Sequence, residues 1–568
     1  MQNPLFIPVS VLLAFTFACT PQSKQHEPKG VTSGRAMVVT AHPLASAAGV
    51  SVLGKGGNAV DAAVTVELCL AVCYPNAGNI AGGGFMVIRM HDGTAVSLDY
   101  REKAPMRASR DMYLDSLGNV IQGSSLHGHR ACGVPGTVAG LFEAHRRYGM
   151  LPWDELVAPA VRMASEGFPL TEIQAADLNR AGSRLLRING RKTALTGKGL
   201  WHAGDTLVQP ELALTLERIR DMGRDGFYRG ETARLIMEEM ERGKGLISNA
   251  DLDAYEPVWR TPVTGMYRGY RIISMPPPSS GGVGLLQMLA MVEPFDLGKM
   301  GWNRPDAVHV MVESARRMYA DRAAYLGDPE FVEIPVEGLL NRDYLKDRMA
   351  GFNMRQAGNS SQFGEGDPSA WESEETTHYS IVDPMGNALA GTTTLNGSYG
   401  SGVIVKGGGF LLNNQMDDFS IKPGFPNLYG LVGGEANAIA PGKRMLSSMT
   451  PTVVEKEGKL FMVLGSPGGS TIITSVFQVL INVIDHHMSM QQAVEAGRFH
   501  HQWLPDTLYC ENRALDRTCL RTLTKKGHHV RRRGAIGRVD AVLVWPGGIL
   551  EGGADPRGDD TAMGLEPR

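Results

Sequence analysis

The sequence predicts a layered α/β domain in which strands are sandwiched between helices on both sides. Three observations support this prediction: small and apolar residues recur at helical spacing near the start of the chain, helical patterns dominate residues 134–350, and hairpin-like strand pairs occur before and after that region. A prior of roughly 150 residues per domain gives three or four domains, although single α/β domains can be larger. No internal repeat is evident.

The composition excludes several classes of protein. Hydrophobic residues make up 43% of the chain and charged residues 20%, so disorder, coiled coil and fibre are not expected. The net charge is −3, and the only basic block, Arg531–Arg533, is explained by a solvated face. We therefore predict no nucleic-acid partner. Glycine is frequent, with 69 residues that cluster in short runs such as AGGGF and SPGGS, where turns or ligand-binding backbone are expected.

The first residues predict export from the cytoplasm. FIPVSVLLAFTFACT has about the length of a signal peptide and is too short for a transmembrane span. It ends at Ala18-Cys19, which resembles the cleavage site of bacterial lipoproteins, although no Lys or Arg precedes the apolar run and Phe17 is bulky for this position. We expect an export segment over 1–19 with a candidate lipid anchor at Cys19, a polar linker over 20–34, and a periplasmic or outer-membrane-anchored protein.

The first part of the mature chain contains one strand, two helices and a hairpin. AMVVTA predicts a short strand, and residues 42–75 predict two packed helices separated at Gly56-Gly57. Residues 82–102 predict a hairpin with a type I′ turn at Asp92-Gly93. The helical region 134–350 is broken by MPPPSSGGVG, an irregular loop that opens a helix.

The last third of the chain begins after a polar segment. Residues 355–375 are rich in Gly, Ser and acidic residues, and we expect them to be mobile. Residues 377–396 predict two strands with a turn at Pro384–Asn387. TVVEKEGKLFMVLG predicts a second hairpin, turning at Glu457-Gly458, and a long apolar helix follows over 471–487.

Cysteine and histidine usage indicates no metal site and no cofactor. Six cysteines leave five if Cys19 carries a lipid, so a fully paired disulfide scaffold is excluded. Cys69 and Cys73 lie at i, i+4 in an apolar helical pattern and are predicted to pack in a core. Neither CxxC nor HExxH occurs, and the His pairs at 486–487, 500–501 and 528–529 lack a ligand partner at helical spacing.

Thr376 stands at the seam EETTHYSIVD, where the polar segment ends and a strand begins. A threonine hydroxyl becomes a nucleophile when a base takes its proton, and a free α-amine on the same residue is one such base. That amine exists only if the bond between Glu375 and Thr376 is broken. The structural alternative is that threonine is simply a good strand residue.

Three further clusters carry chemistry. GSPGGS at 465–470, between a strand and a helix, predicts an oxyanion hole or a plain tight turn, and it lacks the lysine of a phosphate loop. Gln415 and Asp418, on a loop, can accept hydrogen bonds from an ammonium group. Arg101 and Ser447-Ser448 can bind a carboxylate. A solvated or structural role is the alternative for each cluster.

Together these pieces resemble one family, the γ-glutamyltranspeptidases (glutathione hydrolases) of the N-terminal-nucleophile hydrolase superfamily. The resemblance spans roughly residues 34–560 and includes, in order, GGNAVDAAV, AGGGF, DYREKAP, PPPSSGG, TTHYSIVD, TLN, NNQMDDFS, YGLVGG, SSMTPT, GSPGGS, RFHHQWLPD and ADPR. It implies a four-layer αββα sandwich built from two fragments of one precursor. Cleavage between Glu375 and Thr376 would give a large subunit, 35–375, and a small subunit, 376–568.

The resemblance also implies roles for individual residues. Thr376 corresponds to the nucleophile of self-cleavage and catalysis, and Thr394 to the threonine that supports it. Gly468 and Gly469 correspond to the oxyanion hole, and Tyr429 to the tyrosine of a lid loop, 423–434. The substrate's α-carboxylate is bound by Arg101, Ser447 and Ser448, and its α-amine by Asn396, Gln415 and Asp418. The expected partners are γ-glutamyl compounds, glutathione among them, and amino-acid or peptide acceptors.

Two alternatives remain at this point. Cephalosporin acylases of the same superfamily prefer a glutaryl group without the α-amine and lack the lid loop, whereas PGFPNLYGLVGG is present here. An inactive exported binding protein would lack the nucleophile or the glycine pair, and both are present. Hydrolysis and transfer to an acceptor are not distinguished by the sequence.

Overall fold

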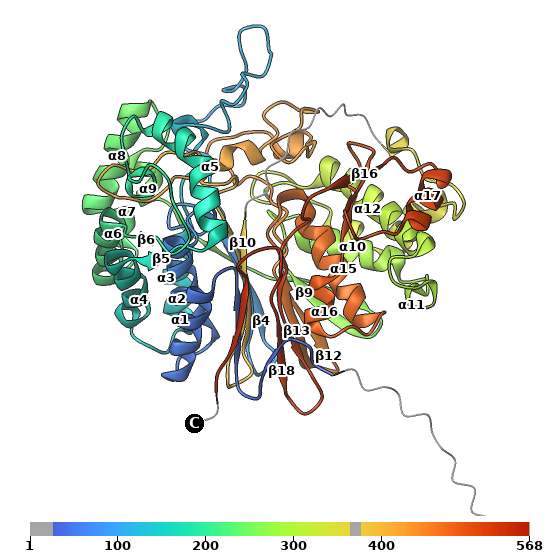
Figure 1. Ribbon diagram of the computed structural model, residues 1–568. Coiled ribbons are helices and arrows are strands. Elements are labelled where there is room, and N and C mark those ends of the chain that lie inside the picture. The colour runs from blue at the N-terminus through green and yellow to red at the C-terminus, as the bar shows by residue number, and fades with distance from the viewer. Residues whose placement is uncertain (1–26, 364–375, 567–568) are drawn as a thin grey trace, which may run out of the picture.

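Two large antiparallel sheets stacked face to face form the centre of the protein, and helices cover the outer face of each sheet (Figure 1). The computed structural model describes residues 27–363 and 376–566. The four layers run helix, sheet, sheet, helix, so the predicted αββα arrangement is confirmed.

The first sheet contains strands from the two ends and the middle of the chain. Its order is β1 (Val31–Ser33), β18 (Leu550–Gly553), β17 (Asp540–Val544), β13 (Lys459–Gly465), β12 (Thr452–Lys456), β9 (Tyr270–Ser274) and β8 (Val263–Tyr267). β12 and β13 are the predicted hairpin, with Glu457 and Gly458 both at positive φ in its turn.

The second sheet carries Thr376 at the start of a central strand. Its order is β19 (Thr561–Gly564), β2 (Met37–Thr40), β10 (Thr377–Val382), β11 (Ala388–Thr394), β3 (Gly83–Arg89), β4 (Ala95–Tyr100) and β7 (Val258–Arg260). β10 and β11 pair with each other and with β2 and β3 on either side. Both strands therefore lie in the interior of the sheet. Two small sheets, β5–β6 (Phe168–Pro169, Thr206–Leu207) and β14–β15–β16 (Phe499–His500, Leu508–Glu511, Val530–Arg533), lie outside the sandwich.

Each helical layer comes mainly from one part of the chain. The second sheet is covered by α1 (Pro43–Gly54), α2 (Ala59–Cys73), α3 (Thr137–Tyr148), α4 (Trp153–Glu166), α5 (Glu172–Asn189), α6 (Pro210–Met222), α7 (Asp225–Tyr228), α8 (Gly230–Gly243) and α9 (Asn249–Asp253). The first sheet is covered by α10 (Gly281–Val292), α11 (Leu297–Met300), α12 (Pro305–Tyr325), α13 (Val336–Leu339), α14 (Arg342–Ala350), α15 (Ile472–Ile484), α16 (Met490–Glu495) and α17 (Arg517–Lys526).

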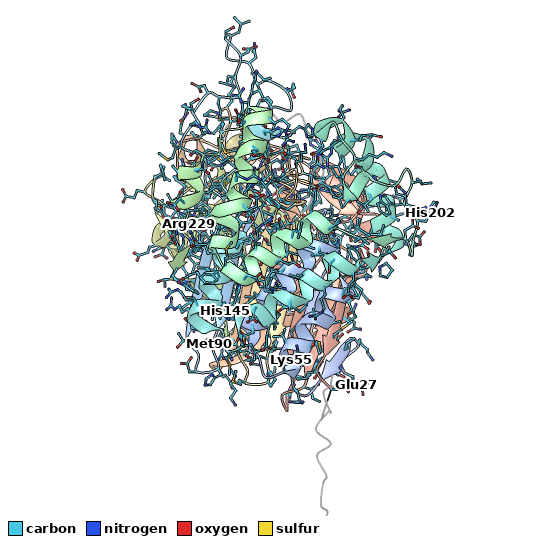
Figure 2. All side chains as sticks on the ribbon, turned by 90° about the vertical axis from the view of Figure 1, so that its left-hand side faces the viewer. Glu27, Lys55, Met90, His145, His202 and Arg229 are labelled. Atoms are coloured by element: carbon cyan, nitrogen blue, oxygen red, sulfur yellow. The ribbon has the colours of Figure 1, made fainter. Side chains whose placement is uncertain are left out.

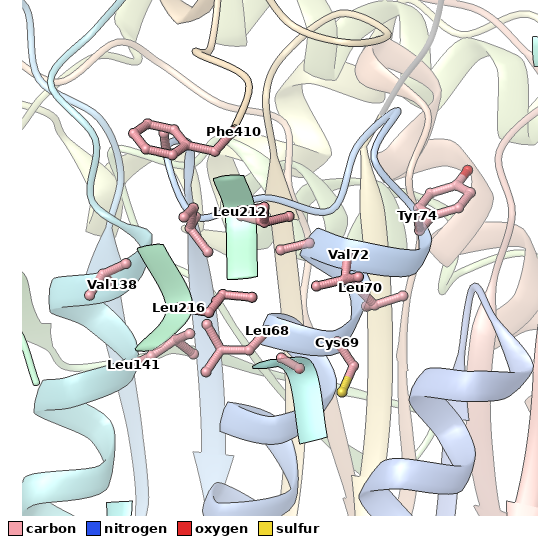
Figure 3. Close-up of a cluster of buried hydrophobic side chains, with 14 of the residues drawn as sticks. Leu68, Cys69, Leu70, Val72, Tyr74, Val138, Leu141, Leu212, Leu216 and Phe410 are labelled. Atoms are coloured by element: carbon pink, nitrogen blue, oxygen red, sulfur yellow. The ribbon is translucent and has the colours of Figure 1, made fainter. Parts of the chain in front are cut away.

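Strand β3 has apolar side chains on both faces because each face packs against another layer. In β3, Phe85 and Val87 belong to the core between the sheets, whereas Met86 and Ile88 belong to the core under the helices. Figure 3 shows the centre of that second core, where Leu68, Cys69 and Leu70 of α2 lie near Leu212 and Leu216 of α6. A continuous apolar run, such as Phe85–Ile88, is the pattern of a strand that is buried on both faces.

Most expected elements are confirmed. The strand at 37–40, the two helices split at Gly56-Gly57, the hairpins and the helix after 471 are all present. Cys69 and Cys73 are fully buried, and the five described cysteines are free. Part of the predicted mobile segment, 364–375, and the predicted export segment, 1–19, lie outside the described residues.

Three details differ from the prediction. Only Gly93 of the Asp92-Gly93 pair has positive φ, and its amide donates to Met90 O at 2.9 Å. The connection is therefore a three-residue loop with glycine in the left-handed region, and the predicted type I′ turn is wrong. The predicted linker 20–34 contains β1, which pairs with β18. Strands β8 and β9 interrupt the helical region; their turn, Arg268-Gly269, has positive φ at both residues.

Polar residues between the helices are exposed on the helical side of the molecule. Figure 2 shows Lys55, His202 and Arg229 on the helical side of the molecule, and all three are exposed. Within the described ranges, no helix has the length and apolar character needed to cross a bilayer.

Candidate active site

A pocket of about 290 Å³ opens where β10 begins and β11 ends. Ten of the residues singled out in the sequence line it: Arg101, Thr376, Thr394, Asn396, Gln415, Asp418, Tyr429, Ser447, Ser448 and Gly469. Gly468 precedes Gly469 in the chain, and Glu375 lies outside the described residues. Segments up to about 370 positions apart in the sequence therefore meet at one site.

The two threonines lie at the same end of the central hairpin. Thr377 pairs with Thr393, so Thr376 and Thr394 extend from neighbouring strand ends. Thr376 is 5% exposed. The amide of Asn396 donates to Thr394 Oγ1 at 2.8 Å, and Asn79 Nδ2 donates to Thr394 O at 3.1 Å. Sheet pairing thus places both threonines, and local hydrogen bonds also hold Thr394.

The glycine loop follows β13 and leads through a 3-10 turn (Gly469–Thr471) into α15. Gly468 has φ 131° and Gly469 φ 50°, conformations that residues with a side chain rarely adopt. A Cβ on Gly469 would lie 2.2 Å from Cδ1 of Tyr429. The Tyr429 ring therefore packs directly on this backbone, and Tyr429 Oη donates to Asn396 O at 2.5 Å.

The other end of the pocket is charged. Arg101 forms a short ion pair with Asp418 and also donates from Nε to Met445 O at 3.3 Å. Gln415 Nε2 donates to the same Asp418 oxygen at 2.8 Å, and Asn427 Nδ2 donates to the other at 3.2 Å. The Asp418 carboxylate is therefore held by three side chains from two different loops.

Three polar atoms of this pocket have no hydrogen-bond partner among the described residues. They are the donor Arg101 Nη1 and the acceptors Asn396 Oδ1 and Gln415 Oε1. A buried polar group without a partner costs roughly 1–3 kcal/mol, so such groups are rare unless a ligand satisfies them. One free donor on a cation and two free acceptors suit a small molecule that carries both a carboxylate and an ammonium group.

Glu102 lies beside the ion pair without weakening it. Its Oε2 is 3.5 Å from Arg101 Nη1. Burial raises the pKa of Glu102 to about 8, against the opposing effect of Arg101. At neutral pH this carboxyl is therefore largely protonated, and the charge of Arg101 remains available to Asp418 and to a ligand.

The two serines are held by backbone and by a second arginine. The Ser447 amide donates to Pro278 O at 2.9 Å, and Ser448 Oγ accepts from Arg322 Nη2 at 3.3 Å. Arg322 lines the pocket as well, together with Leu431, Leu446, Met449 and Ile472. Sequence reasoning missed Arg322 because an arginine in a helical pattern is normally exposed.

A cluster of two histidines and a glutamate lies outside the pocket. His528 is far from the other two members in the sequence, so only the fold brings the three together. His309, Glu313 and His528 bring their ligand atoms within 4.8 Å of one another. His309 Nε2 donates to Asn353 O at 2.9 Å, so its Nδ1 accepts from His528 Nε2 at 2.7 Å. Glu313 forms ion pairs with Arg316 and Arg317. These contacts account for the cluster as a buried hydrogen-bond network between α12 and the segment after α17.

The four-layer fold, with a threonine at the head of a central strand, defines the class of N-terminal-nucleophile hydrolases. Residues 45–565 match the sequence profile of the gamma-glutamyltranspeptidase family, and the chain belongs to this family.

Individual relatives agree with this assignment. The chain is 47% identical over 538 residues to the glutathione hydrolase proenzyme of Escherichia coli (strain K12), with 94% of this chain and 92% of that protein covered. It is 38% identical over 566 residues to the acylase ACY 1 proenzyme of Pseudomonas sp. (strain V22), with 98% and 97% covered. The crystal structure of cephalosporin acylase from Bacillus halodurans superposes with a TM-score of 0.83 at 26% identity, over 97% of this chain and 100% of that one.

Proposed function

We propose that this protein is a self-cleaving γ-glutamyltransferase that hydrolyses or transfers the γ-glutamyl group of glutathione and related compounds. The observation that carries the proposal is a set of three polar atoms, on residues that share a pocket with Thr376, that have no hydrogen-bond partner among the described residues: Arg101 Nη1, Asn396 Oδ1 and Gln415 Oε1. A γ-glutamyl amide has a reactive carbonyl at one end and a zwitterion at the other. The pocket offers a nucleophile to the first and a matched set of charges to the second.

In this proposal the two charged groups of the substrate bind to two different sets of side chains in the pocket. Arg101, Ser447 and Ser448 bind the α-carboxylate, while Asp418, Asn396 and Gln415 accept hydrogen bonds from the α-ammonium group. Arg101 and Asp418 pair with each other in the structure described here. Each then gains the opposite charge of the ligand, so the bound head group leaves neither charge uncompensated.

Self-cleavage creates the catalytic base. Thr376 Oγ attacks the carbonyl carbon of Glu375, the C–N bond breaks, and the acyl group moves to oxygen as an ester. Water then hydrolyses that ester, which releases the Glu375 carboxylate and leaves Thr376 with a free α-amine. Such an amine titrates near 7.7–8.0 in model compounds, which suits a general base at neutral pH.

Catalysis repeats the same chemistry on the substrate. The amine takes the Thr376 hydroxyl proton as Oγ attacks the γ-carbonyl carbon, and the resulting oxyanion accepts hydrogen bonds from the amides of Gly468 and Gly469. Collapse breaks the C–N bond, and the leaving amine takes the proton. Water or an acceptor amine then attacks the γ-glutamyl ester and restores Thr376. Thr394 supports the nucleophile from the neighbouring strand.

The two proposed fragments, 35–375 and 376–568, remain associated after cleavage. β10 and β11 of the small fragment lie between β2 and β3 of the large one, and β8 and β9 of the large fragment extend the sheet that contains β12 and β13. Separation would break strand pairs in both sheets. The mature protein is therefore a heterodimer derived from one precursor.

The glutaryl acylase alternative fits the pocket less well. A glutaryl group has no ammonium, so Asn396 Oδ1 and Gln415 Oε1 would stay buried without donors. Tyr429 of the lid loop is also present and packs on Gly469. These features favour a γ-glutamyl group.

We further propose that residues 1–19 direct export and that Cys19 is the candidate lipid attachment site of a periplasmic or outer-membrane-anchored enzyme. Metabolic labelling with a fatty acid, with Cys19→Ala as the matched control, tests the anchor. Label on the wild type alone supports it, and label on neither protein contradicts it.

The function is tested with purified protein and γ-glutamyl p-nitroanilide. The wild type is expected to appear as two fragments on a denaturing gel and to release p-nitroaniline. Thr376→Ala is expected to stay a single chain and to lose at least about 10⁴-fold in kcat, as nucleophile variants do. If cleaved wild type accepts only the glutaryl anilide, the acylase assignment replaces this one. An uncleaved, inactive wild type would overturn the mechanism.

A further inference from the structure

Arg322 is a second buried arginine at the carboxylate end of the pocket. It lies on α12, is 5% exposed, and lines the cavity together with Arg101 and Asp418. Its Nε donates to Ser280 Oγ at 3.0 Å, and its Nη2 donates to Ser448 Oγ at 3.3 Å. Its partners in these two contacts are therefore both neutral hydroxyls.

No carboxylate lies within ion-pair distance of this guanidinium in the part of the chain that the structure describes. Two other buried arginines of the same helix, Arg316 and Arg317, each form an ion pair with Glu313. A buried charge without a counter-ion is costly, and arginine does not lose its proton in proteins. The charged side chains that line the pocket, Arg101, Arg322 and Asp418, give it a net charge of +1.

We propose that Arg322 is a positioning and specificity residue for the substrate's α-carboxylate, an inference that rests on the proposed γ-glutamyl function. Because Ser448 Oγ accepts from Arg322, its own proton is free to point toward a carboxylate. Ser280 Oγ donates to Ser447 O at 2.6 Å, so Arg322 also fixes the backbone between the two serines. The excess positive charge favours an anionic group at this end.

A purely structural role makes a different prediction. If Arg322 only ties α12 to the Ser280 and Ser448 loops, its loss should slow every substrate by a similar factor. If it acts through the α-carboxylate, its loss should slow only substrates that have one. Two anilides distinguish these roles: γ-glutamyl p-nitroanilide and 4-aminobutyryl p-nitroanilide, which keeps the amine and lacks the carboxylate.

The experiment measures kcat/KM of Arg322→Gln with both anilides, on protein whose cleavage into two fragments confirms folding. We expect a loss of about 10- to 100-fold for the γ-glutamyl compound, typical of a charged hydrogen-bond network, and less than about threefold for the 4-aminobutyryl compound. Arg317→Gln is the matched control, because Arg317 is buried on the same helix and is not among the residues that line the pocket. It should leave the ratio of the two kcat/KM values as in the wild type.

The outcomes separate the two proposals. Equal losses on both anilides would overturn the role of Arg322, while wild-type turnover would still support the γ-glutamyl function. A wild type that ignores γ-glutamyl p-nitroanilide would overturn the function itself. If Arg322→Gln is not cleaved, the same two kcat/KM values are measured for Arg322→Lys. This variant keeps the positive charge and loses the planar set of N–H donors of the guanidinium. A selective loss of about three- to tenfold supports the proposal, and an equal factor on both anilides contradicts it.

Discussion

The two ends of the pocket are held in place by different kinds of structure. Thr376 and Thr394 lie at the paired ends of β10 and β11, in the interior of a seven-stranded sheet. Arg101 and Asp418, at the other end, come from a strand end and from a short 3-10 turn within a long loop region. The reaction end thus depends on sheet pairing, whereas the head-group end depends on side-chain contacts between loops.

This difference separates chemistry from recognition. Self-cleavage needs only the reaction end, because the scissile carbonyl belongs to the chain itself. Turnover of a γ-glutamyl substrate needs both ends, because remote binding of the zwitterion positions the carbonyl. Changes at the head-group end should therefore leave self-cleavage intact and reduce turnover, which gives a direct way to test the division.

The largest effect among such changes is expected for Asp418→Asn. The change leaves Arg101 without its counter-ion and removes the charged acceptor for the ammonium group, a type of loss worth about 3–5 kcal/mol. We expect kcat/KM for γ-glutamyl p-nitroanilide to fall about 10²- to 10⁴-fold, with cleavage into two fragments unchanged. Steady-state kinetics and a denaturing gel measure the two quantities on one preparation.

Glutaryl p-nitroanilide serves as the internal control for that variant. It has no ammonium group, so its kcat/KM should change much less than that of the γ-glutamyl compound. If Asp418→Asn remains a single chain, self-cleavage also depends on the head-group end. Equal losses of kcat/KM on both anilides would assign Asp418 a structural role.

A smaller effect is expected at the contact that joins the two ends. Tyr429 packs on Gly469 and donates to the carbonyl of Asn396. Tyr429→Phe keeps the ring over the glycine and removes one neutral hydrogen bond, worth about 1 kcal/mol. We expect kcat/KM to fall about three- to tenfold, mainly through a higher KM. A loss confined to kcat would instead place the effect of Tyr429 on the oxyanion loop.

The sequence predicts those parts of the site that are marked by residues close together in the chain, and it does not predict contacts between distant residues. The hairpins, the Gly468-Gly469 loop and the strand that follows Thr376 are marked by residues close together in the chain, and these elements form at the expected positions. The assignment of Arg101 and Asp418 to one substrate-binding site follows from family resemblance and not from spacing, and their ion pair is seen only in the structure. Arg322 gave no signal, because only the fold reveals that this arginine is buried and lines the pocket.

Glu67 is a second buried group that the sequence did not mark, and it lies behind the reaction end. It sits on α2, where its Oε2 accepts from Tyr379 Oη at 2.6 Å and from Tyr100 Oη at 3.1 Å. Tyr379 belongs to β10, three residues after Thr376. Glu67 forms no ion pair with any described residue, and burial raises its pKa from 4.5 to about 7. This contrasts with Asp418, whose charge is paired with Arg101.

The smallest predicted effect follows from that contrast. Since the folded pKa of Glu67 exceeds the unfolded value, the folded state binds more protons between pH 4.5 and 7, and stability falls as pH rises through this window. Glu67→Gln keeps an acceptor for both tyrosines and cannot ionise, so it removes this loss, which is on the order of 3 kcal/mol above pH 8. We expect the apparent Tm of the variant to exceed that of the wild type by about 3 °C at pH 9 and to match it at pH 5.

Thermal unfolding followed by circular dichroism at several pH values, at one scan rate, measures this difference. Glu166→Gln, the same chemical change at an exposed position at the end of α4, should show no pH-dependent gain. If Glu67→Gln lowers the Tm equally at pH 5 and pH 9, the two tyrosines require a carboxylate at every pH. The reaction end would then depend on a buried charge, as the head-group end depends on Asp418. If the gain in Tm appears only at high pH, protonated Glu67 is the form that stabilises the strand after Thr376. The reaction end then contains a neutral carboxyl group, whereas the head-group end contains an ionised one.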